Sequence, residues 1–212
     1  LALTDLGNGK YSFTMPDGKV EVNGTFVKKS AQTFVDVPEN AYYAPAVAWA
    51  VEKGVTEGTS ATTFSPDAVC TRAQIVTFLY RAAGSPAVKS AVNPFTDVSA
   101  SDYYYNAVLW AVENGITTGT SETTFSPNES CTRAQCVTFL YRAVGSAATA
   151  KAIFTDVSAD AYYAPAVDWA VEKGVTDGTS ATTFFPDAAC TRAQLVTLLY
   201  RLESQATDMV NY

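Results

Sequence analysis

The chain contains no histidine and only four cysteines among its 212 residues. Without histidine it lacks the usual general base near neutral pH, the central member of serine-histidine catalytic groups and the commonest metal ligand. The cysteines form no CxxC pair, which argues against a zinc site. These absences exclude many enzyme mechanisms, and we expect neither a cofactor nor a metal ion.

Long hydrophobic runs and an excess of positive charge are also missing. No segment approaches the roughly 18 consecutive apolar residues of a membrane helix, and the first residues lack the basic-then-apolar layout of a signal peptide. Because the chain also begins without methionine, we expect it to be a piece of a longer protein. A net charge of −7 argues against nucleic acid as a partner.

What the chain does have is a threefold internal repeat. Residues 34–81, 95–142 and 154–201 align without a gap, and the first and third copies are identical at 38 of 48 positions. The middle copy is more divergent. Residues 82–94 and 143–153 are rich in Ala, Ser and Val and are expected to be short linkers. With 48% hydrophobic residues, the chain can bury a full core.

Each copy predicts two helices joined by a polar loop. The first helix is Ala-rich with apolar residues on one face, and Pro45 is tolerated in its first turn. Glycines end this helix in the three copies at Gly54, Gly115 and Gly174. A loop of Thr, Ser, Gly and Pro follows. The sequence therefore predicts a mainly α protein.

The start of the second helix carries a capping box, in which a threonine and the glutamine three residues later satisfy each other's backbone amides. The pairs are Thr71 with Gln74, Thr132 with Gln135, and Thr191 with Gln194. The residue before the cap is expected to pack on the fourth helical residue: Cys70 on Ile75, Cys131 on Cys136, and Cys190 on Leu195. This makes the cysteines small buried side chains. The alternative is a disulfide between Cys131 and Cys136.

Residues 1–30 differ in character from the repeats. Apolar and polar residues alternate on both sides of Pro16-Asp17-Gly18, a pattern typical of a β-hairpin. Since a lone hairpin is marginal in water, we expect either the tail of a truncated upstream β-rich domain or a hairpin that packs on the helices.

The order of these features resembles the S-layer homology (SLH) motif in triplicate. Each copy runs from Phe-x-Asp-Val through an aromatic-Ala helix start and Gly-Val/Ile-x-x-Gly-Thr to Phe-x-Pro and Cys-Thr-Arg-Ala-Gln. The resemblance covers about residues 34–202, with motifs at 34–81, 95–142 and 154–202. It implies a pseudo-threefold bundle with lobes, forming one monomeric domain of a larger secreted surface protein. Such a domain anchors that protein non-covalently to secondary cell wall polysaccharide in Gram-positive-type envelopes, as in S-layers.

The resemblance also implies which residues bind carbohydrate. In the family, the arginine of a Thr-Arg-Ala-Glu signature contacts the ligand, often a pyruvylated amino sugar, in grooves between motifs. Here that role falls on Arg72, Arg133 and Arg192. Their expected companions are Gly58 and Thr59, Gly119 and Thr120, and Gly178 and Thr179. The signature ends in Gln where Glu is common, and the loop reads Ser-Ala/Glu-Thr-Thr-Phe where Asp-Gly-Thr-Phe is common, so polymer preference is expected to differ.

The position of these arginines is itself unusual. They occupy the first helical position, where the positive end of the helix dipole disfavours a cation. The last-turn arginines are favoured there and need no functional explanation: Arg81, Arg142 and Arg201. We interpret the first set as a carboxylate site made by a guanidinium and free helix amides. The alternative, which can coexist with it, is a salt bridge in the groove to the aspartates, which we therefore also count among the candidate carbohydrate-binding residues: Asp36, Asp97 and Asp156.

Aromatic residues are the other carbohydrate-binding candidates, because a ring suits one apolar and one wet side. They are Trp49, Trp110 and Trp169, with the tyrosine pairs Tyr42/Tyr43, Tyr103/Tyr104 and Tyr162/Tyr163. Their more ordinary role is core packing. The middle copy carries Asn106, Asn114 and Glu122 in place of Pro45, Lys53 and Ala61, so we expect unequal use of the three copies.

Two other functions stay open. A glycosidase would use paired carboxylates such as Asp36 and Glu52. Repetition argues against it, because a catalytic pair is needed once and this pair recurs in every copy. Stacked helical repeats also serve as protein-protein scaffolds, although a domain of three would close on itself. We therefore expect no enzyme.

Overall fold

The computed structural model describes residues 4–5, 11–12, 14, 34–89, 92–144 and 147–208. The chain divides into two compact units, Leu1–Ser30 and Ala31–Tyr212. In the first unit two short strands, β1 (Thr4–Asp5) and β2 (Tyr11–Ser12), pair antiparallel. The turn predicted at Pro16 to Gly18 lies outside the described residues.

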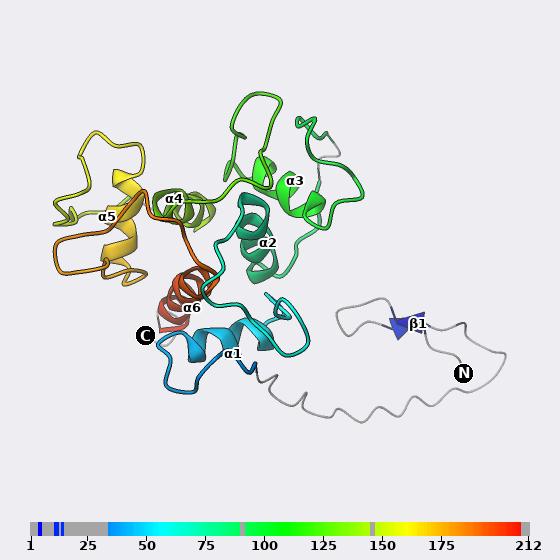
Figure 1. The fold of residues 1–212 in the computed structure, drawn as a ribbon. Coiled ribbons are helices and arrows are strands. Elements are labelled where there is room, and N and C mark those ends of the chain that lie inside the picture. Colours follow the sequence, from blue (N-terminus) through cyan, green and yellow to red (C-terminus); the bar gives the residue numbers. More distant parts are fainter. Residues whose placement is uncertain are drawn as a thin grey trace. The chain divides into compact units, whose positions relative to one another are not determined.

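The second unit contains two helices from each repeat. The first helices are α1 (Ala44–Glu52), α3 (Tyr105–Glu113) and α5 (Ala164–Glu172). The second helices are α2 (Arg72–Ala82), α4 (Arg133–Val144) and α6 (Arg192–Asp208). Figure 1 shows the second helices gathered at the centre and the first helices around them. The predicted mainly α bundle of three helix-loop-helix motifs is confirmed.

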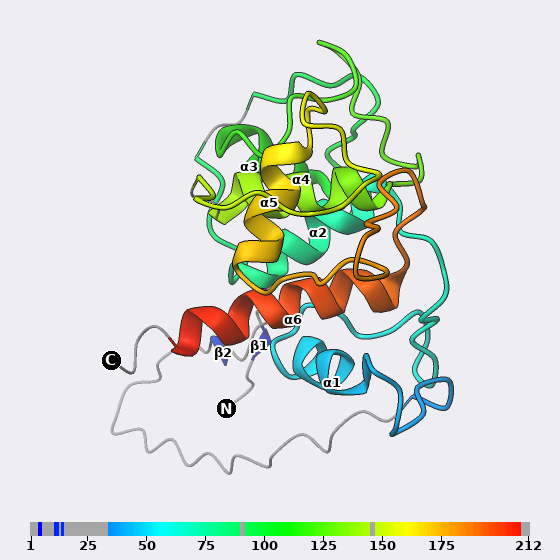
Figure 2. The same cartoon turned by 90° about the vertical axis from the view of Figure 1, so that its left-hand side faces the viewer.

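The motifs interlock in a closed cycle. Helix α3 packs on α2 and α5 packs on α4, so each first helix rests on the second helix of the preceding motif. The cycle closes because α1 packs on α6, the last helix of the chain. Figure 2 shows α6, the longest helix, from the side, with α1 against it. The three motifs therefore form one domain and cannot extend as an open stack.

The centre of the cycle is a ring of backbone hydrogen bonds through three cysteines. The amide of Cys70 donates to the carbonyl of Cys190 at 2.9 Å, that of Cys131 to Cys70 at 3.0 Å, and that of Cys190 to Cys131 at 2.8 Å. Each motif thus donates to one neighbour and accepts from the other. The ring satisfies polar groups that would otherwise be buried without partners.

The cysteine side chains are fully buried and free. The disulfide considered between Cys131 and Cys136 is absent, since both cysteines are free. Burial raises the pKa of the Cys70 and Cys131 thiols to about 12, which keeps them neutral. The expected contacts of the three cysteines with the fourth helical residues stay a prediction, although all these side chains share one core.

The predicted helix boundaries hold. In α2 the Thr71 hydroxyl accepts from the Gln74 amide, and the Gln74 side chain accepts from the Thr71 amide. The same reciprocal bonds start α4 and α6. The glycine after each first helix has a positive φ, 70° at Gly54, which is the left-handed conformation that ends a helix.

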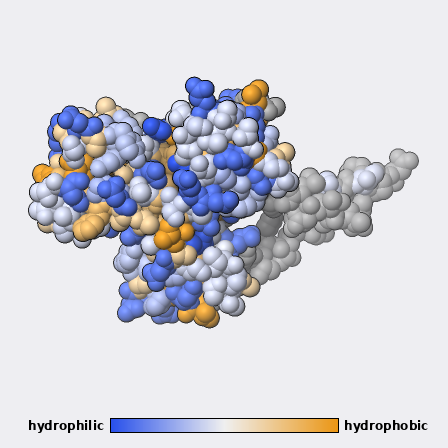
Figure 3. Space-filling model, turned by 45° about the horizontal axis from the view of Figure 1, so that its top comes forward, coloured by the Kyte–Doolittle hydropathy of each residue, from blue (hydrophilic) through white to orange (hydrophobic). Residues whose placement is uncertain are grey.

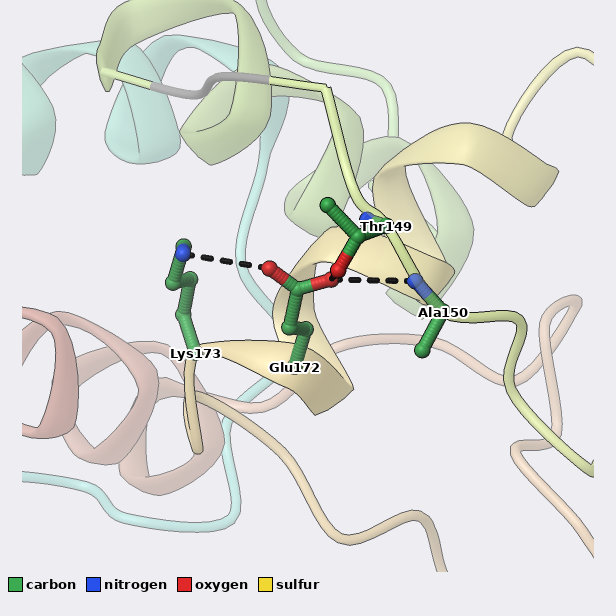
Figure 4. A network of polar contacts seen from close by, with 4 residues as sticks. All are labelled: Thr149, Ala150, Glu172 and Lys173. Carbon is green, nitrogen blue, oxygen red and sulfur yellow. Dashed lines mark hydrogen bonds and ion pairs between the residues drawn. The ribbon is translucent and has the colours of Figure 1, made fainter.

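The linkers are held by the first helices. The Glu172 carboxylate at the end of α5 accepts from the Thr149 amide at 2.6 Å, the Thr149 hydroxyl at 2.9 Å and the Ala150 amide at 3.1 Å (Figure 4). Lys173 Nζ lies 3.2 Å from its other oxygen. Glu113 accepts from the Lys89 amide in the same way. These glutamates therefore fix the connection between consecutive motifs.

The surface of the helical unit is mainly hydrophilic, with small hydrophobic spots, in the space-filling view (Figure 3). Within the described residues, no helix is long and apolar enough to span a membrane.

Candidate groove sites between the motifs

The arginines at the start of the second helices each reach into the next motif. Nε of Arg72 donates to the carbonyl of Phe125 at 2.9 Å, and its guanidinium lies 5.0 Å from the centre of the Phe125 ring. Arg133 makes the same contacts with Phe184, and Arg192 with Phe64. We call Arg72, Arg133 and Arg192 the inner arginines. They explain how a cation is tolerated at this end of a helix: a carbonyl and an aromatic face of the neighbour stabilise it.

The helix amides beside the inner arginines are not free, contrary to our interpretation from the sequence. The Arg72 amide donates to the Glu129 carbonyl at 2.9 Å, and the Ala73 amide to the Pro127 carbonyl at 3.0 Å. The third amide, of Gln74, is taken by the Thr71 cap. The other two second helices begin in the same way. A helix that starts against another motif's loop has its amides satisfied there, so the guanidinium is left as the anion-binding group.

The predicted salt bridges to the aspartates are also absent. Among the described residues, no aspartate forms an ion pair with an inner arginine. Instead Asp36 accepts from the backbone amides of Phe64 and Ser65 at 2.8 and 2.7 Å. Asp97 and Asp156 bind the equivalent amides of their own motifs. Arg192 binds the carbonyl of Phe64, so the aspartate and the arginine bind the same residue, one at its amide and the other at its carbonyl.

These aspartates are strong acceptors. Burial raises the pKa of the Asp36 carboxyl, but the two backbone hydrogen bonds outweigh it and hold the pKa below its usual value. The same balance lowers the pKa of Asp156. The carboxylates therefore shape the loop as anions and are unsuited to donating a proton.

Grooves lie where the inner arginines cross between motifs. Groove 2 measures about 190 Å³ and is lined by Arg72 of the first motif, Tyr162 of the third, and residues of the second: Thr117, Thr118, Gly119, Gln135, Thr138, Phe139 and Arg142. Groove 3 measures about 320 Å³ and is lined by Tyr42, Arg133, Thr176, Gly178, Thr179, Gln194, Thr197, Leu198 and Arg201. Each groove thus combines all three motifs.

The first motif carries the equivalent set, which we call groove 1. One terminal nitrogen of Arg192 donates to the Thr56 hydroxyl at 3.4 Å. The other members of groove 1, by equivalence with grooves 2 and 3, are Arg81 and Tyr103. Burial raises the pKa of Tyr103, and the positive charges of Arg81 and Arg192 act against this rise.

The inner arginines are 4 to 6% exposed. Burial lowers their pKa values, yet a guanidinium stays charged at neutral pH. The terminal nitrogens of Arg72 and Arg133 have no acceptor among the described residues. Among the described residues, the fully buried side-chain nitrogen that lacks a hydrogen-bond partner is Nε1 of Trp49. It follows that the terminal nitrogens of Arg72 and Arg133 are not fully buried. These nitrogens therefore face the water of grooves 2 and 3.

Sequence reasoning missed a second arginine in each groove. Arg142 lines groove 2 and Arg201 lines groove 3, and Arg81 is their equivalent in groove 1. We call these the outer arginines. They had been explained by the helix dipole alone. Nine residues at about 100° each place Arg133 and Arg142 on opposite faces of α4, so each helix gives its inner arginine to one groove and its outer arginine to another. The signal that could have found Arg142 is its spacing of seven and four residues from Gln135 and Thr138, which line the same groove.

The glycines expected beside the arginines line grooves 2 and 3, and they are needed for a close approach. A Cβ on Gly119, whose φ is 85°, would lie 2.5 Å from the Phe95 ring and 2.5 Å from the Thr124 carbonyl. Gly58 and Gly178 pack on Phe34 and Phe154 in the same way. The adjoining threonines mainly brace the loop: Thr120 Oγ1 lies 2.7 Å from the Ser126 hydroxyl, and Thr59 equally close to Ser65.

The tryptophans lie away from grooves 2 and 3, in the joints between motifs. Trp49 packs on Tyr200, Trp110 on Tyr80 and Trp169 on Tyr141, with ring centres 5.6 to 5.9 Å apart. Trp169 is 2% exposed, which leaves no face for a sugar. The exposed aromatics of the grooves are tyrosines, Tyr162 and Tyr42, at 64% and 66% exposure.

Within the described residues, no group of three or more Cys, Asp or Glu side chains is placed to hold a metal ion. The chemistry available in the grooves is therefore that of two guanidinium groups, hydroxyl and amide donors and an exposed phenol ring. This set suits an acidic, hydroxyl-rich ligand.

Comparison with known proteins places these features in a family. The model of the S-layer homology domain matches residues 33–76, 94–135 and 153–196. The chain is 39% identical over 116 residues to an endoglucanase of Bacillus sp. (strain KSM-635), covering 55% of this chain and 12% of that protein. It is 33% identical over 108 residues to the surface-layer 125 kDa protein of Lysinibacillus sphaericus, covering 51% and 9%.

A longer match, 26% identical over 187 residues, is to the S-layer protein of Bacillus thuringiensis subsp. finitimus, covering 84% of this chain and 22% of that protein. The chain thus spans less than a quarter of the length of these relatives. Because the three family matches together cover more than half of the chain and coincide with the three motifs of the structure, the chain belongs to the S-layer homology domain family.

Proposed function

We propose that this chain anchors a larger surface protein non-covalently to a polysaccharide of the bacterial cell wall, by binding acidic sugars in the grooves between its motifs. The observation that carries the proposal is the pairing, in grooves 2 and 3, of two arginines with an exposed tyrosine. A guanidinium binds a carboxylate such as that of a pyruvate ketal, and the phenol ring offers an apolar face to the sugar.

The comparisons support attachment at the cell surface. The family match covers all three motifs, and relatives include proteins named as surface-layer and cell surface proteins. Polysaccharide as the partner and the pyruvyl group as its charged feature are our proposal, drawn from groove chemistry. No acidic residue is among the described residues that line groove 2, and in groove 3 the carboxylate of Asp177 is bound to Arg201 at the rim; a largely cationic lining agrees with an anionic ligand.

A glycosidase is disfavoured by the state of its candidate carboxylates. A general acid needs a raised pKa. The pKa of Asp156 is lowered, and the hydrogen bonds from Thr149, Ala150 and Lys173 lower the pKa of Glu172 to about 2. Both groups already serve the fold as acceptors. We expect no release of sugar from purified wall by this chain.

Co-sedimentation with cell wall sacculi tests the proposed function. The triple variant Arg81→Gln, Arg142→Gln, Arg201→Gln removes one cation from each groove while sparing the inner arginines, whose loss would damage the joints between motifs. We expect its binding to fall at least about tenfold, since each charge-assisted pair contributes about 1.5 kcal/mol or more. Far-ultraviolet circular dichroism and thermal melting check that it stays folded.

The matched control is Lys53→Gln, Lys151→Gln, Lys173→Gln, which changes the net charge equally outside the described grooves. It should bind sacculi like the unaltered chain. Sacculi from which pyruvyl groups have been removed chemically should be bound weakly by all forms. Equal binding by the two triple variants would contradict the assignment of the grooves, and unchanged binding to treated wall would contradict the pyruvyl group.

A further inference from the structure

The position just before the groove glycine differs in charge among the three motifs. The residue before the groove glycine is Glu57 in the first motif, Thr118 in the second and Asp177 in the third. Thr118 itself lines groove 2. The inner arginine, the outer arginine and the glycine are the same in all three motifs, so this position is the main variable in groove charge.

Asp177 changes the state of the outer arginine beside it. Arg201 donates from NH1 to the Asp177 carboxylate at 3.0 Å. In the other motifs the equivalent nitrogen donates to a neutral carbonyl at 3.3 Å: Arg142 to Ile116 and Arg81 to Val55. Groove 3 therefore holds one arginine already paired with a carboxylate, whereas among the described residues neither arginine of groove 2 has a carboxylate partner.

Groove 1 is also less favourable to an anion than groove 2. It carries the acidic Glu57 at the variable position, and one terminal nitrogen of Arg192 is engaged by the Thr56 hydroxyl. Groove 2 has neither feature, because Thr118 is neutral and no hydrogen bond joins Arg72 to Thr117.

One acidic residue acts against this ranking. Burial lowers the pKa of Arg72, and the negative charge of Glu129 acts against this lowering. The matching positions of the other motifs hold Ala68 and Ala188. Glu129 is exposed and does not line groove 2. Asp177 is exposed as well, but it binds Arg201 directly at 3.0 Å, whereas among the described residues Glu129 forms no ion pair with a groove arginine.

We propose that groove 2 is the preferred anion site of this domain and that the residue at positions 57, 118 and 177 sets the order among the grooves. The inference rests on the proposed function, because it ranks grooves for the same acidic ligand. Thr118 leaves both guanidinium groups available to the ligand carboxylate, whereas in groove 3 the ligand competes with Asp177 for Arg201 and is repelled by it.

An exchange of the two residues tests the ranking in the intact chain. The probe is a methyl glycoside of a pyruvylated amino sugar, titrated at low salt and followed by the amide resonances of Gly119 and Gly178, which report grooves 2 and 3 separately. We expect groove 2 to bind about three- to tenfold more tightly, the ratio that one unit charge at 5 to 6 Å produces in a largely aqueous site. Thr118→Asp should weaken groove 2 alone, and Asp177→Thr should strengthen groove 3 alone.

Both positions are exposed, so neither exchange should alter the fold. Glu129→Ala is the control and should strengthen groove 2 less than Asp177→Thr strengthens groove 3. Equal affinities in the unaltered chain, or exchanges that leave the order unchanged, would overturn the ranking while leaving carboxylate recognition intact. If no groove responds to the pyruvylated probe, or all respond equally to the sugar without pyruvate, carboxylate recognition fails and the ranking with it.

Discussion

The inner and outer arginines lie on the same helices, yet each helix gives the two to different grooves and holds them in different ways. Arg133 is 6% exposed, binds the Phe184 carbonyl of the next motif and lies 4.7 Å from the centre of its ring. Arg142, nine residues later, is exposed and contacts a carbonyl of its own motif at 3.3 Å. The comparison separates two roles of one residue type: the inner set joins the motifs and lines the groove, whereas the outer set supplies groove charge alone.

The largest effect expected from this comparison is on stability. Arg133→Ala should lower the free energy of unfolding by about 3 kcal/mol, because it leaves the Phe184 carbonyl without its donor and removes the cation from the ring face. Arg142→Ala, in the same helix, is the matched control and should lower it by less than about 1 kcal/mol. Urea unfolding followed by tryptophan fluorescence measures both. Similar losses for the two variants would break the distinction between inner and outer arginines.

A smaller effect is expected from the aspartates that hold the same residues as the inner arginines. Asp156→Asn should lower the free energy of unfolding by about 1 to 2 kcal/mol at pH 7, because one amide of Phe184 or Phe185 loses its acceptor. The folded-state pKa of Asp156 lies below its unfolded value, so its stabilisation is complete above about pH 4 and disappears as the pH falls through the folded pKa.

Thermal melting at a series of pH values between 7 and 2 checks this sign. The difference between Asp156→Asn and the unaltered chain should shrink as the pH falls, because both then carry an uncharged side chain. A difference that grows in acid would show that the carboxylate does not stabilise the loop as an anion.

The smallest effect on stability is expected at the outer arginine of groove 3. Arg201→Gln breaks the pair with Asp177, but both side chains are largely exposed, at 40% and 82%. Exposed ion pairs contribute about 0.5 kcal/mol or less, so the urea midpoint should hardly move. We also expect the same variant to weaken binding of the pyruvylated probe in groove 3. This outcome would show that Arg201 contributes to binding without contributing measurably to stability.

The fold was largely predictable because each repeat carries strong local signals. The reciprocal Thr71 and Gln74 bonds and the left-handed Gly54 were read from residue types that few other conformations explain. Threefold repetition confirmed each boundary twice more. The strand pair at β1 and β2 was less accessible, because the alternating pattern pointed to the segment around Pro16 to Gly18 instead.

The site was predicted in part. Arg72, Arg133 and the groove glycines were named from the resemblance, and the structure places them in grooves 2 and 3. The free helix amides and the salt bridges to aspartate were wrong, because both arguments considered one motif at a time. The partners of these groups are a carbonyl, a ring and a loop of the next motif, which no spacing within a repeat can reveal.

The sequence by itself determined the helices, their caps, the repeat and the family, because these depend on residues within a few turns of one another. Only the tertiary structure decided that the last motif packs on the first, through Arg192 to Phe64 and α6 to α1. That closure turns each helix start toward a neighbour, satisfies its amides there and leaves paired guanidinium groups facing a groove. Within the third motif the structure also pairs Arg201 with Asp177, so that nearly identical copies become unequal sites.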